Sequence, residues 1–413
     1  MEKESQVGGL CRSIEHEGGV FDIGGHSFHT PFPEVRHLVE SLMCDNWETQ
    51  QRDARVYSHG ELIPYPFQKH FEQLHDLKIV GECRDGLLRA AGAEKARNFE
   101  EYIVGRFGTG VAKHFMLPYN RKLWARDLKK LSCEWTGQRV AAPKGVIEHF
   151  DTQGGERKPL QPDTMVGYPA KGGYVEIFKS FVPHVPRVEV NQGVVRIDPV
   201  GKVVETGSGL LVKWQSLVST MPLPHLLRVL AGTHDHLLRL VDQLEYMSLN
   251  LLLVLVRRQL PSAPHRIYVA DPDVPPHKIA FNHTSSRSLA EKPVHAIMAE
   301  ISYSPEKPLA GKEEIERKTV DFLVNADVLE SSSDVAWIDH LDVRYAYPVY
   351  THERPSIVSE IKAYLRQFEI FTLGRFGEWE YINSDKCIMK GIDLAERLER
   401  DLLTAPVLGY RES

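Results

Sequence analysis

The sequence predicts a mixed α/β protein, with a helical region early in the chain and a strand-rich region in its second half. Apolar residues recur at helical spacing from about residue 70 to residue 124, as in QLHDLKIVGECRDGLLRAA and EKARNFEEYIVGRF. Apolar runs typical of strands follow at 244–257, 265–270, 278–282 and 294–303. Two glycine pairs, Gly8-Gly9 and Gly24-Gly25, lie within the first 30 residues. Such pairs favour either close backbone approach to a large flat ligand or two hairpin turns, and the residues alone leave both open.

Composition limits the class of protein. The chain has 413 residues, enough for two or three domains, and its 42% hydrophobic and 26% charged residues are ordinary for a globular enzyme. A formal net charge of −6 argues against general binding to nucleic acids or anionic membranes. Five cysteines without C-x-x-C spacing favour reduced thiols over disulfides or a metal site. With no signal peptide in MEKESQVGG and no apolar run long enough for a bilayer, we expect a cytoplasmic protein without a membrane span.

The remaining elements are predicted from periodicity and turn signals. We expect helices at 31–43, 174–181, 313–329, from 354 and at the C-terminus, a hairpin at 55–67, and strands within 188–221 and in IFTLGRFGEWEY. Residues 135–175 are rich in Gly, Pro and polar side chains, so we expect loops lining a site there.

Eight sequence blocks, in order across nearly the whole chain, resemble the UDP-galactopyranose mutase family, and its eukaryotic-type members more than the shorter bacterial ones. The blocks read VGGLCRS, FDIGGHSFH, LIPYPFQ, FGTGVAKHFMLPYNRKLWA, GQRVAAP, YPAKGG, LVSTMP and GRFGEWEYINSDKCIMKG. The glycines, LVSTMP and the last block are shared with the wider flavoprotein group that includes amine oxidases and protoporphyrinogen oxidase. PYPFQ, PYN-x-K-x-W, G-x-RVAAP and GRFG-x-W-x-Y are specific to the mutases.

The resemblance implies a discontinuous FAD-binding Rossmann-like (GR2-type) domain, a helical subdomain and an antiparallel sheet domain that binds substrate. The FAD-binding domain would comprise 1–32, 172–240 and 354–413, the helical subdomain 70–134, and the substrate domain 48–69 and 241–350. The match begins after the family's first strand, G-x-G-x-x-G turn and helix. We therefore expect this first βα unit to be missing and the sequence to begin inside a longer protein.

The activity that the resemblance implies is the interconversion of UDP-galactopyranose and UDP-galactofuranose, an isomerase (intramolecular transferase) reaction. In the family, reduced FAD uses its N5 atom to attack the anomeric carbon of the sugar and displace UDP. The expected cofactor is therefore FAD, with NAD(P)H as reductant, and the expected partner is a UDP-sugar. The resemblance leaves a homo-oligomer open.

Three residues are expected to be catalytic on the matched motifs. His26 matches the histidine beside the flavin ring, where an imidazole can tune N5. Arg139, in GQRVAAP, matches an arginine that clamps the diphosphate with its planar guanidinium. The family's second diphosphate arginine lies ten residues after a tyrosine matched by Tyr268, but here that position is Lys278, which keeps the charge and loses the fork.

The motifs also supply binding residues. Expected substrate contacts are Tyr65 and Gln68 for the uracil, Asn120 and Trp124 on one helix face, Tyr268 and Lys278, and Tyr347, Tyr381 and Asn383 with Arg139 at the diphosphate. Asp163 falls where the family has an asparagine, and a carboxylate near a diphosphate is unfavourable. Expected cofactor contacts are Glu2 at the adenosine ribose, Gly8, Gly9, Leu10, Gly24, Gly25, His26, Val194 at the adenine, Arg375, and Met389 where the last helix points its N-terminus at the flavin.

Two alternatives remain open. Lys278 and Asp163 are compatible with an FAD-dependent oxidoreductase of the amine oxidase and protoporphyrinogen oxidase group that acts on another substrate. A chain without its pyrophosphate-binding turn could also be a non-enzymatic remnant that cannot bind FAD, because it would lack its anion site and expose a sheet edge.

Overall fold

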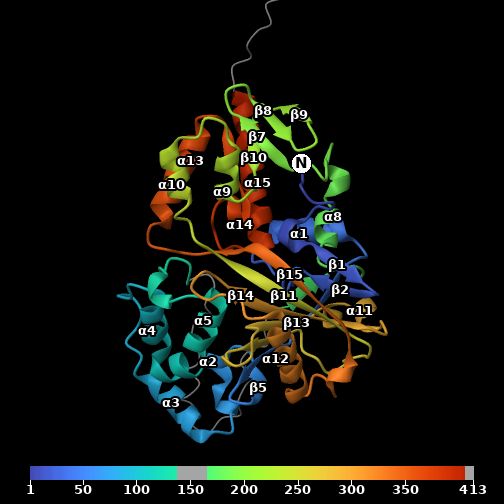
Figure 1. Cartoon of the computed structure of the whole chain (residues 1–413), viewed down its shortest axis with the longest axis vertical. Helices are drawn as coiled ribbons and strands as arrows, with labels where there is room; N and C mark the ends of the chain where they lie inside the picture. The colour runs from blue at the N-terminus through green and yellow to red at the C-terminus, as the bar shows by residue number, and fades with distance from the viewer. Residues whose placement is uncertain (137–164, 405–413) are drawn as a thin grey trace, which may run out of the picture.

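The structure is a computed structural model that describes residues 1–136 and 165–404, and its centre is a seven-stranded sheet (Figure 1). The strands run in the order β15 (Val335–Pro348), β11 (Tyr246–Val256), β14 (His295–Tyr303), β13 (Lys278–Phe281), β12 (Arg266–Val269), β4 (Ala54–Ser58) and β5 (Glu61–Pro64). Only β12 and β4 are parallel neighbours. Strands β11 and β14 are buried over almost their whole length, which explains their continuous apolar sequences.

The two faces of this sheet have different covers. The apolar face of α12 (Lys312–Asn325) packs on one face through Ile315, Phe322 and Leu323. A hairpin of β1 (Ser13–His16) and β2 (Gly19–Asp22) brings Phe21 to the opposite face. The first 30 residues therefore reach the second half of the chain directly, against strands more than 200 residues away in sequence.

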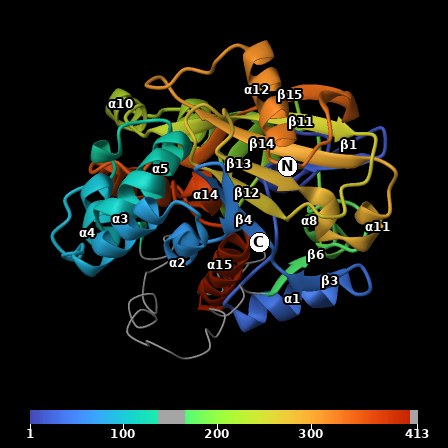
Figure 2. The same ribbon diagram turned by 90° about the horizontal axis from the view of Figure 1, so that it is seen from below.

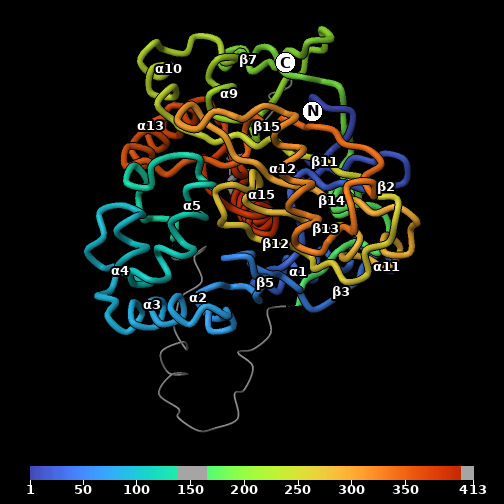
Figure 3. The backbone as a smooth tube through the Cα atoms, turned by 60° about the horizontal axis from the view of Figure 1, so that its bottom comes forward, coloured from blue at the N-terminus to red at the C-terminus, as the bar shows by residue number. Residues whose placement is uncertain are grey.

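A block of helices lies beside the sheet (Figures 1 and 3). It comprises α2 (Phe67–His70), α3 (Leu77–Leu88), α4 (Phe99–Val111), a π-helical turn (Ala112–Met116) and α5 (Leu117–Trp124). Asp76 and Asn98 cap the starts of α3 and α4 by accepting hydrogen bonds from backbone amides. The π-helical turn comes just before Pro118, which has no amide hydrogen for a regular ladder. The helices predicted from residue 70 to residue 124 are confirmed.

Glycines allow α3 and α4 to approach at backbone distance. A Cβ atom at Gly108 would lie only 1.9 Å from the carbonyl oxygen of Gly86, and Gly108 has a φ of +70°. Gly110 likewise faces the backbone of Glu82. The FGTG sequence is therefore explained by the packing of two helices.

The part of the molecule at the top of Figure 1 is built from two segments, one in the middle of the chain and one at its end. It contains the antiparallel strands β7 (Val194–Asp198), β8 (Val203–Thr206) and β9 (Leu211–Lys213), the parallel pair β10 (Leu217–Ser219) and β16 (Ile370–Thr372), and the helices α9 (Leu223–Val229), α10 (Asp235–Val241), α13 (Arg354–Arg366), α14 (Gly374–Gly377) and α15 (Ser384–Thr404). One apolar core holds these elements together.

Most of the remaining elements contribute to a small core that α15 also joins. The remaining elements are α1 (Pro33–Met43), β3 (Glu48–Gln51) paired with β6 (Met165–Tyr168), α8 (Glu176–Lys179) and α11 (Arg287–Ala290). Figure 2 shows α1 next to α15, and the two helices share a small core with Tyr168 and Tyr174. Among the described residues, no helix combines the length and apolarity needed to cross a membrane.

The mixed α/β class is confirmed, whereas several local predictions are wrong. Strand β15 was not predicted, because polar residues such as Asp339, Asp342 and Arg344 interrupt its apolar pattern. The strand predicted in IFTLGRFGEWEY ends at Thr372, since Gly374 has a φ of +82° and begins α14. The helix predicted at 174–181 is only the single turn α8.

The glycine contact between α3 and α4 gives a stability test. We expect Gly108→Ala to lower the free energy of unfolding by about 3 kcal/mol or more, through overpacking and a positive φ. Gly81→Ala is the matched control, because a Cβ atom at Gly81 in α3 meets nothing within 4 Å and should stabilise by up to about 1 kcal/mol. Urea denaturation of both variants measures the change in the free energy of unfolding. Equal changes in Gly108→Ala and Gly81→Ala would contradict the close contact at Gly108.

Candidate functional site

Three neighbouring strands carry a row of polar side chains on one face of the central sheet. Tyr268 of β12 lies opposite Lys278 of β13, and Lys278 lies opposite Glu300 of β14. Directly paired residues point to the same side of a sheet, as do residues two apart in one strand. Arg266 therefore shares the face with Tyr268. Residues 268 and 278 are ten positions apart in sequence, but the antiparallel β12–β13 hairpin places Lys278 directly opposite Tyr268.

Glu300 is the buried centre of this row. Its side chain has no solvent exposure, and Oε1 accepts hydrogen bonds from Nζ of Lys278 at 2.7 Å and from the backbone amide of Gly25 at 2.8 Å. Burial alone would raise the pKa of Glu300, but the charge of Lys278 and the contact with His277 lower it overall. Glu300 is therefore ionised, and it fastens the Gly24-Gly25 segment to the sheet.

His26 follows this fastened segment. A Cβ atom at Gly25 would lie 3.1 Å from the Cβ of Ala280, so the glycine is required by close approach to the protein's own sheet. The His26 ring stacks on Tyr174 with 4.6 Å between ring centres, and its Nδ1 is shielded from solvent without a hydrogen-bond partner in the described structure. Burial, then the charges of Lys278 and Arg266, lower the pKa of His26 to about 3, so the imidazole is neutral near pH 7.

Tyr174 connects His26 to the start of the last helix. Its hydroxyl lies 2.8 Å from Oγ of Ser384, the first residue of α15. The prediction that this helix begins near Met389 is wrong, because Met389 lies in the second turn and packs beside the small core around α1. The helix N-terminus nevertheless approaches His26, through a tyrosine that sequence reasoning did not identify.

Two arginines flank the hydroxyl of Tyr268. Arg52 donates from Nη2 to this hydroxyl at 3.0 Å and lies over the ring of Tyr65, which packs on the Tyr268 ring at 4.7 Å. Arg266 is the second arginine, and its Nη2 donates to Oγ of Ser27 at 2.6 Å. Burial would raise the pKa of Tyr268, but the charges of Arg52, Arg266 and Lys278 lower it to about 8.

A second aromatic group contains the other predicted substrate tyrosines. The rings of Tyr347 and Tyr381 lie 4.9 Å apart, and the Arg375 guanidinium is 5.1 Å and 5.6 Å from their centres. Arg375 also donates to the carbonyls of Ile382 and Ala346, so it ties β15 to the segment that leads into α15. Its cofactor role stays a prediction.

Asn120 and Trp124 do share one face of α5. Trp124 is 1% exposed and packs edge-on against Tyr381, while Asn120 donates from its amide to the carbonyl of Met116. Gln68 is buried at the start of α2, beside Tyr65 in the chain, and Asn383 immediately precedes α15. The structure thus brings these residues close to the tyrosines without testing what they bind.

The residues predicted to contact the adenosine part of FAD come from two segments, one at Glu2 and one at 189–194. The amide of Glu2 donates to the carbonyl of Glu189, and the amide of Gln192 donates to the carbonyl of Glu2. Glu2 therefore lies beside the strand that begins at Val194, while its carboxylate accepts from the amide of Glu4. Gly8 has a φ of +111°, a Cβ atom at Gly9 meets nothing within 4 Å, and Leu10 packs on the adjacent core.

These features fit a flavin cofactor. The unpartnered, shielded Nδ1 of His26 can bond a polar edge, and the open space at Gly9 leaves room for a ligand along the N-terminal wall. His26, Gly8, Gly9 and the start of α15 are the residues that would hold it. Arg139 and Asp163 lie outside the described residues.

Sequence reasoning missed four functional candidates: Arg52, Lys122, Arg266 and Glu300. Buried Lys122 donates to the carbonyls of Asp271, Val274 and Pro276, at 2.7, 2.7 and 2.8 Å, and so fixes the loop before Lys278. Signals did exist for three of them. Lys122 lies inside PYN-x-K-x-W, Arg266 is two residues before Tyr268, and Glu300 is a lone carboxylate in an apolar strand.

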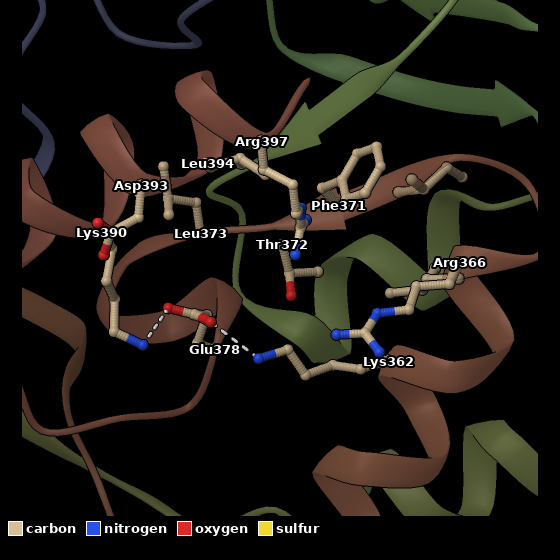
Figure 4. Close-up of a pocket in the computed structure, with 12 residues that line it drawn as sticks. Lys362, Arg366, Phe371, Thr372, Leu373, Glu378, Lys390, Asp393, Leu394 and Arg397 are labelled. Carbon is tan, nitrogen blue, oxygen red and sulfur yellow. Dashed lines mark hydrogen bonds and ion pairs between the residues drawn. The ribbon is translucent and has the colours of Figure 1, made fainter. Parts of the chain in front are cut away.

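A separate basic pocket of about 160 Å³ lies between α13, β16 and α15 (Figure 4). Its cations are Lys362, Arg366, Lys390 and Arg397, and Glu378 bridges Lys362 and Lys390 at 2.8 Å each. None of the predicted site residues lines it.

Comparison with known proteins agrees with this fold. The family described as flavin containing amine oxidoreductase matches residues 1–297. A crystal structure of reduced UDP-galactopyranose mutase is 25% identical, with a TM-score of 0.86 over 96% of this chain and 89% of that one. A protoporphyrinogen oxidase candidate from Exiguobacterium sp. 255-15 (13% identity, TM-score 0.68, covering 95% and 92%) and a fatty acid isomerase from P. acnes (14%, 0.65, 96% and 91%) share the fold.

The Lys278–Glu300 pair predicts an acid-dependent stability. Because the folded-state pKa of Glu300 is below its ordinary value, its contribution is fully present above about pH 5 and is lost as the pH falls through the lower folded pKa. Glu300→Gln leaves Lys278 unmatched and should cost about 3–5 kcal/mol at neutral pH, with a difference from wild type that shrinks in acid. Urea unfolding across this pH range tests this. Glu291→Gln, at an exposed carboxylate, should change little.

The arginines around Tyr268 predict a tyrosine that ionises early. Ultraviolet titration should show one phenolate forming near pH 8 in the wild type and none there in Tyr268→Phe. Tyr57→Phe is the control, because burial raises the pKa of Tyr57 and its removal should leave the early step in place. An unchanged early step in Tyr268→Phe would contradict the assignment.

Proposed function

The chain belongs to the family of flavin containing amine oxidoreductases, and within it we propose that this protein is a UDP-galactopyranose mutase-like isomerase. The proposed reaction interconverts UDP-galactopyranose and UDP-galactofuranose with reduced FAD, for which NAD(P)H would be the reductant. The similarity to reduced UDP-galactopyranose mutase over 96% of the chain supports it.

The observation that carries the proposal is the shared anchoring of His26 and Lys278. The amide of Gly25, next to His26, and the amine of Lys278 both donate to Oε1 of Glu300. Residues more than 250 positions apart are thereby held around one place, where a flavin-facing histidine and a diphosphate-facing cation are both needed.

The chain's residues divide the work along the proposed substrate. Tyr65 and Gln68 would hold the uracil, and the hydroxyls of Tyr347 and Tyr381 would donate to the diphosphate without adding charge. Lys278, with Arg139, would stabilise the negative charge that develops on departing UDP. Neutral His26 would hold or accept a proton at Nδ1 beside the flavin. When bound, reduced FAD would supply the nucleophile that attacks the sugar.

A second candidate function is oxidation of another substrate by the same flavin fold. The engagement of Lys278 with Glu300 favours it, because that carboxylate already neutralises the charge expected at the diphosphate. Such an enzyme would reduce its flavin with an amine or related substrate and would not rearrange a sugar nucleotide.

The test is an isomerisation assay on the FAD-loaded, chemically reduced protein with UDP-galactofuranose. We expect conversion to UDP-galactopyranose, and a loss of about 100-fold or more in kcat in His26→Ala. His75→Ala should retain the rate, because that side chain is 93% exposed on the surface. Absence of isomerisation, with amine-dependent reduction of the oxidised flavin, would instead support the second candidate.

A further inference from the structure

We propose that Arg266 binds a carboxylate on the sugar, so that the preferred substrate is a UDP-sugar acid (a UDP-uronate) and not a neutral UDP-hexose. This inference rests on the proposed function and names the substrate class of the same site. It was not anticipated from any sequence motif.

Arg266 lies between the sheet and the segment that carries His26. It projects from the same face as Tyr268 and lies opposite the small residue Ala280, which leaves room for the guanidinium. Its Nη2 donates to Ser27, and its Nε lies 3.5 Å from the Cβ position of Gly25. Ser27, after His26, is thus in contact with this arginine, and Gly25, before His26, lies near it. The arginine's place is at the flavin-facing end of the site, where the sugar must react.

The opposite end of the same row faces the expected nucleotide position. On the far side of Tyr268 lie Arg52 and Tyr65, and Tyr65 is the residue expected to hold the uracil. Contacts therefore run from Ser27, next to His26, through Arg266 to Tyr268 and Tyr65, with Lys278 opposite Tyr268. Arg266 falls on the sugar side of this order.

Among the described residues, no carboxylate forms an ion pair with Arg266. Its partners are two hydroxyl groups, those of Ser27 and Tyr268, and no described carboxylate lies within 4 Å of its guanidinium. Lys278, in contrast, has Glu300. His26 and His277 are neutral near pH 7, because burial lowers the pKa of both.

The direct contacts leave a place for one carboxylate at Arg266. Lys278 is paired with Glu300, whereas Arg266 has no carboxylate in direct contact. Asp22 also acts on Arg266 electrostatically, but its oxygens accept hydrogen bonds from Ser13, Tyr168 and the amide of Tyr174. A half-buried guanidinium without a carboxylate partner is costly, and a planar carboxylate satisfies it with two parallel hydrogen bonds. A neutral hexose offers hydroxyls alone at this place and leaves the charge unmatched.

The experiment measures dissociation constants of three probes on the FAD-loaded, reduced protein: UDP, UDP-galactose and UDP-galacturonate. In the wild type we expect UDP-galacturonate to bind about tenfold more tightly than UDP-galactose, or better. Arg266→Gln should reduce this ratio to about twofold or less while leaving the affinity for UDP nearly unchanged. Arg257→Gln is the matched control, because Arg257 is an exposed arginine at the end of β11, and it should keep the wild-type ratio.

Three outcomes would overturn the proposal, and they are distinguishable. Equal binding of the two sugar nucleotides by the wild type removes the carboxylate preference, and this comparison needs no variant to fold. An equal loss for all three probes in Arg266→Gln assigns the arginine to the diphosphate. Failure of the wild type to bind any of the three refutes the proposed function itself, and the inference with it.

Discussion

The buried carboxylate of Glu300 is the interaction on which the candidate site depends. It lies in β14, an inner and almost fully buried strand, where an ionised group is stable only with a matched partner. Lys278 supplies that partner from the neighbouring strand, and Gly25 adds a backbone amide from the N-terminal segment. One side chain therefore fixes the distance between the segment that carries His26 and the sheet face of Lys278 and Tyr268. Without it, the loop that carries His26 would keep only the hydrogen bond from Arg266 to Ser27 among the anchors described on this face.

A second set of contacts aligns the helical block with the same sheet. Lys122, at the end of the helix that follows the π-helical turn, donates to three carbonyls in the loop before His277. Trp124 places its ring against Tyr381, which comes from the far end of the chain. The close glycine contact joins α3 to α4, and α4 leads through the π-helical turn into α5, which carries Lys122 and Trp124. The helical block thus contacts both the loop between β12 and β13, through Lys122, and Tyr381, through Trp124.

The positive charges on the sheet face decide which chemistry the site can support. One flavoprotein fold hosts isomerisation and oxidation of unrelated substrates, so the backbone does not settle the reaction. Lys278 is occupied by Glu300, whereas Arg266 meets only hydroxyl groups. The cation without a carboxylate partner is therefore Arg266 on β12, and not Lys278 on the neighbouring strand β13. That difference is the physical basis for expecting a substrate with an additional acid group.

The sequence by itself determined the helices of the helical block and the buried strands, because each leaves a local signal. Helical spacing marked 70–124, and apolar runs marked β11, β12, β13 and β14. Tertiary structure alone decided what the site residues contact. Strand β15 has too many polar residues to be recognised locally, and α15 begins at Ser384, where the hydroxyl of Ser384 contacts Tyr174. Arg266 and Glu300 acquire their roles only when strands from three parts of the chain and the segment at Gly25 meet, a pairing that no local pattern specifies.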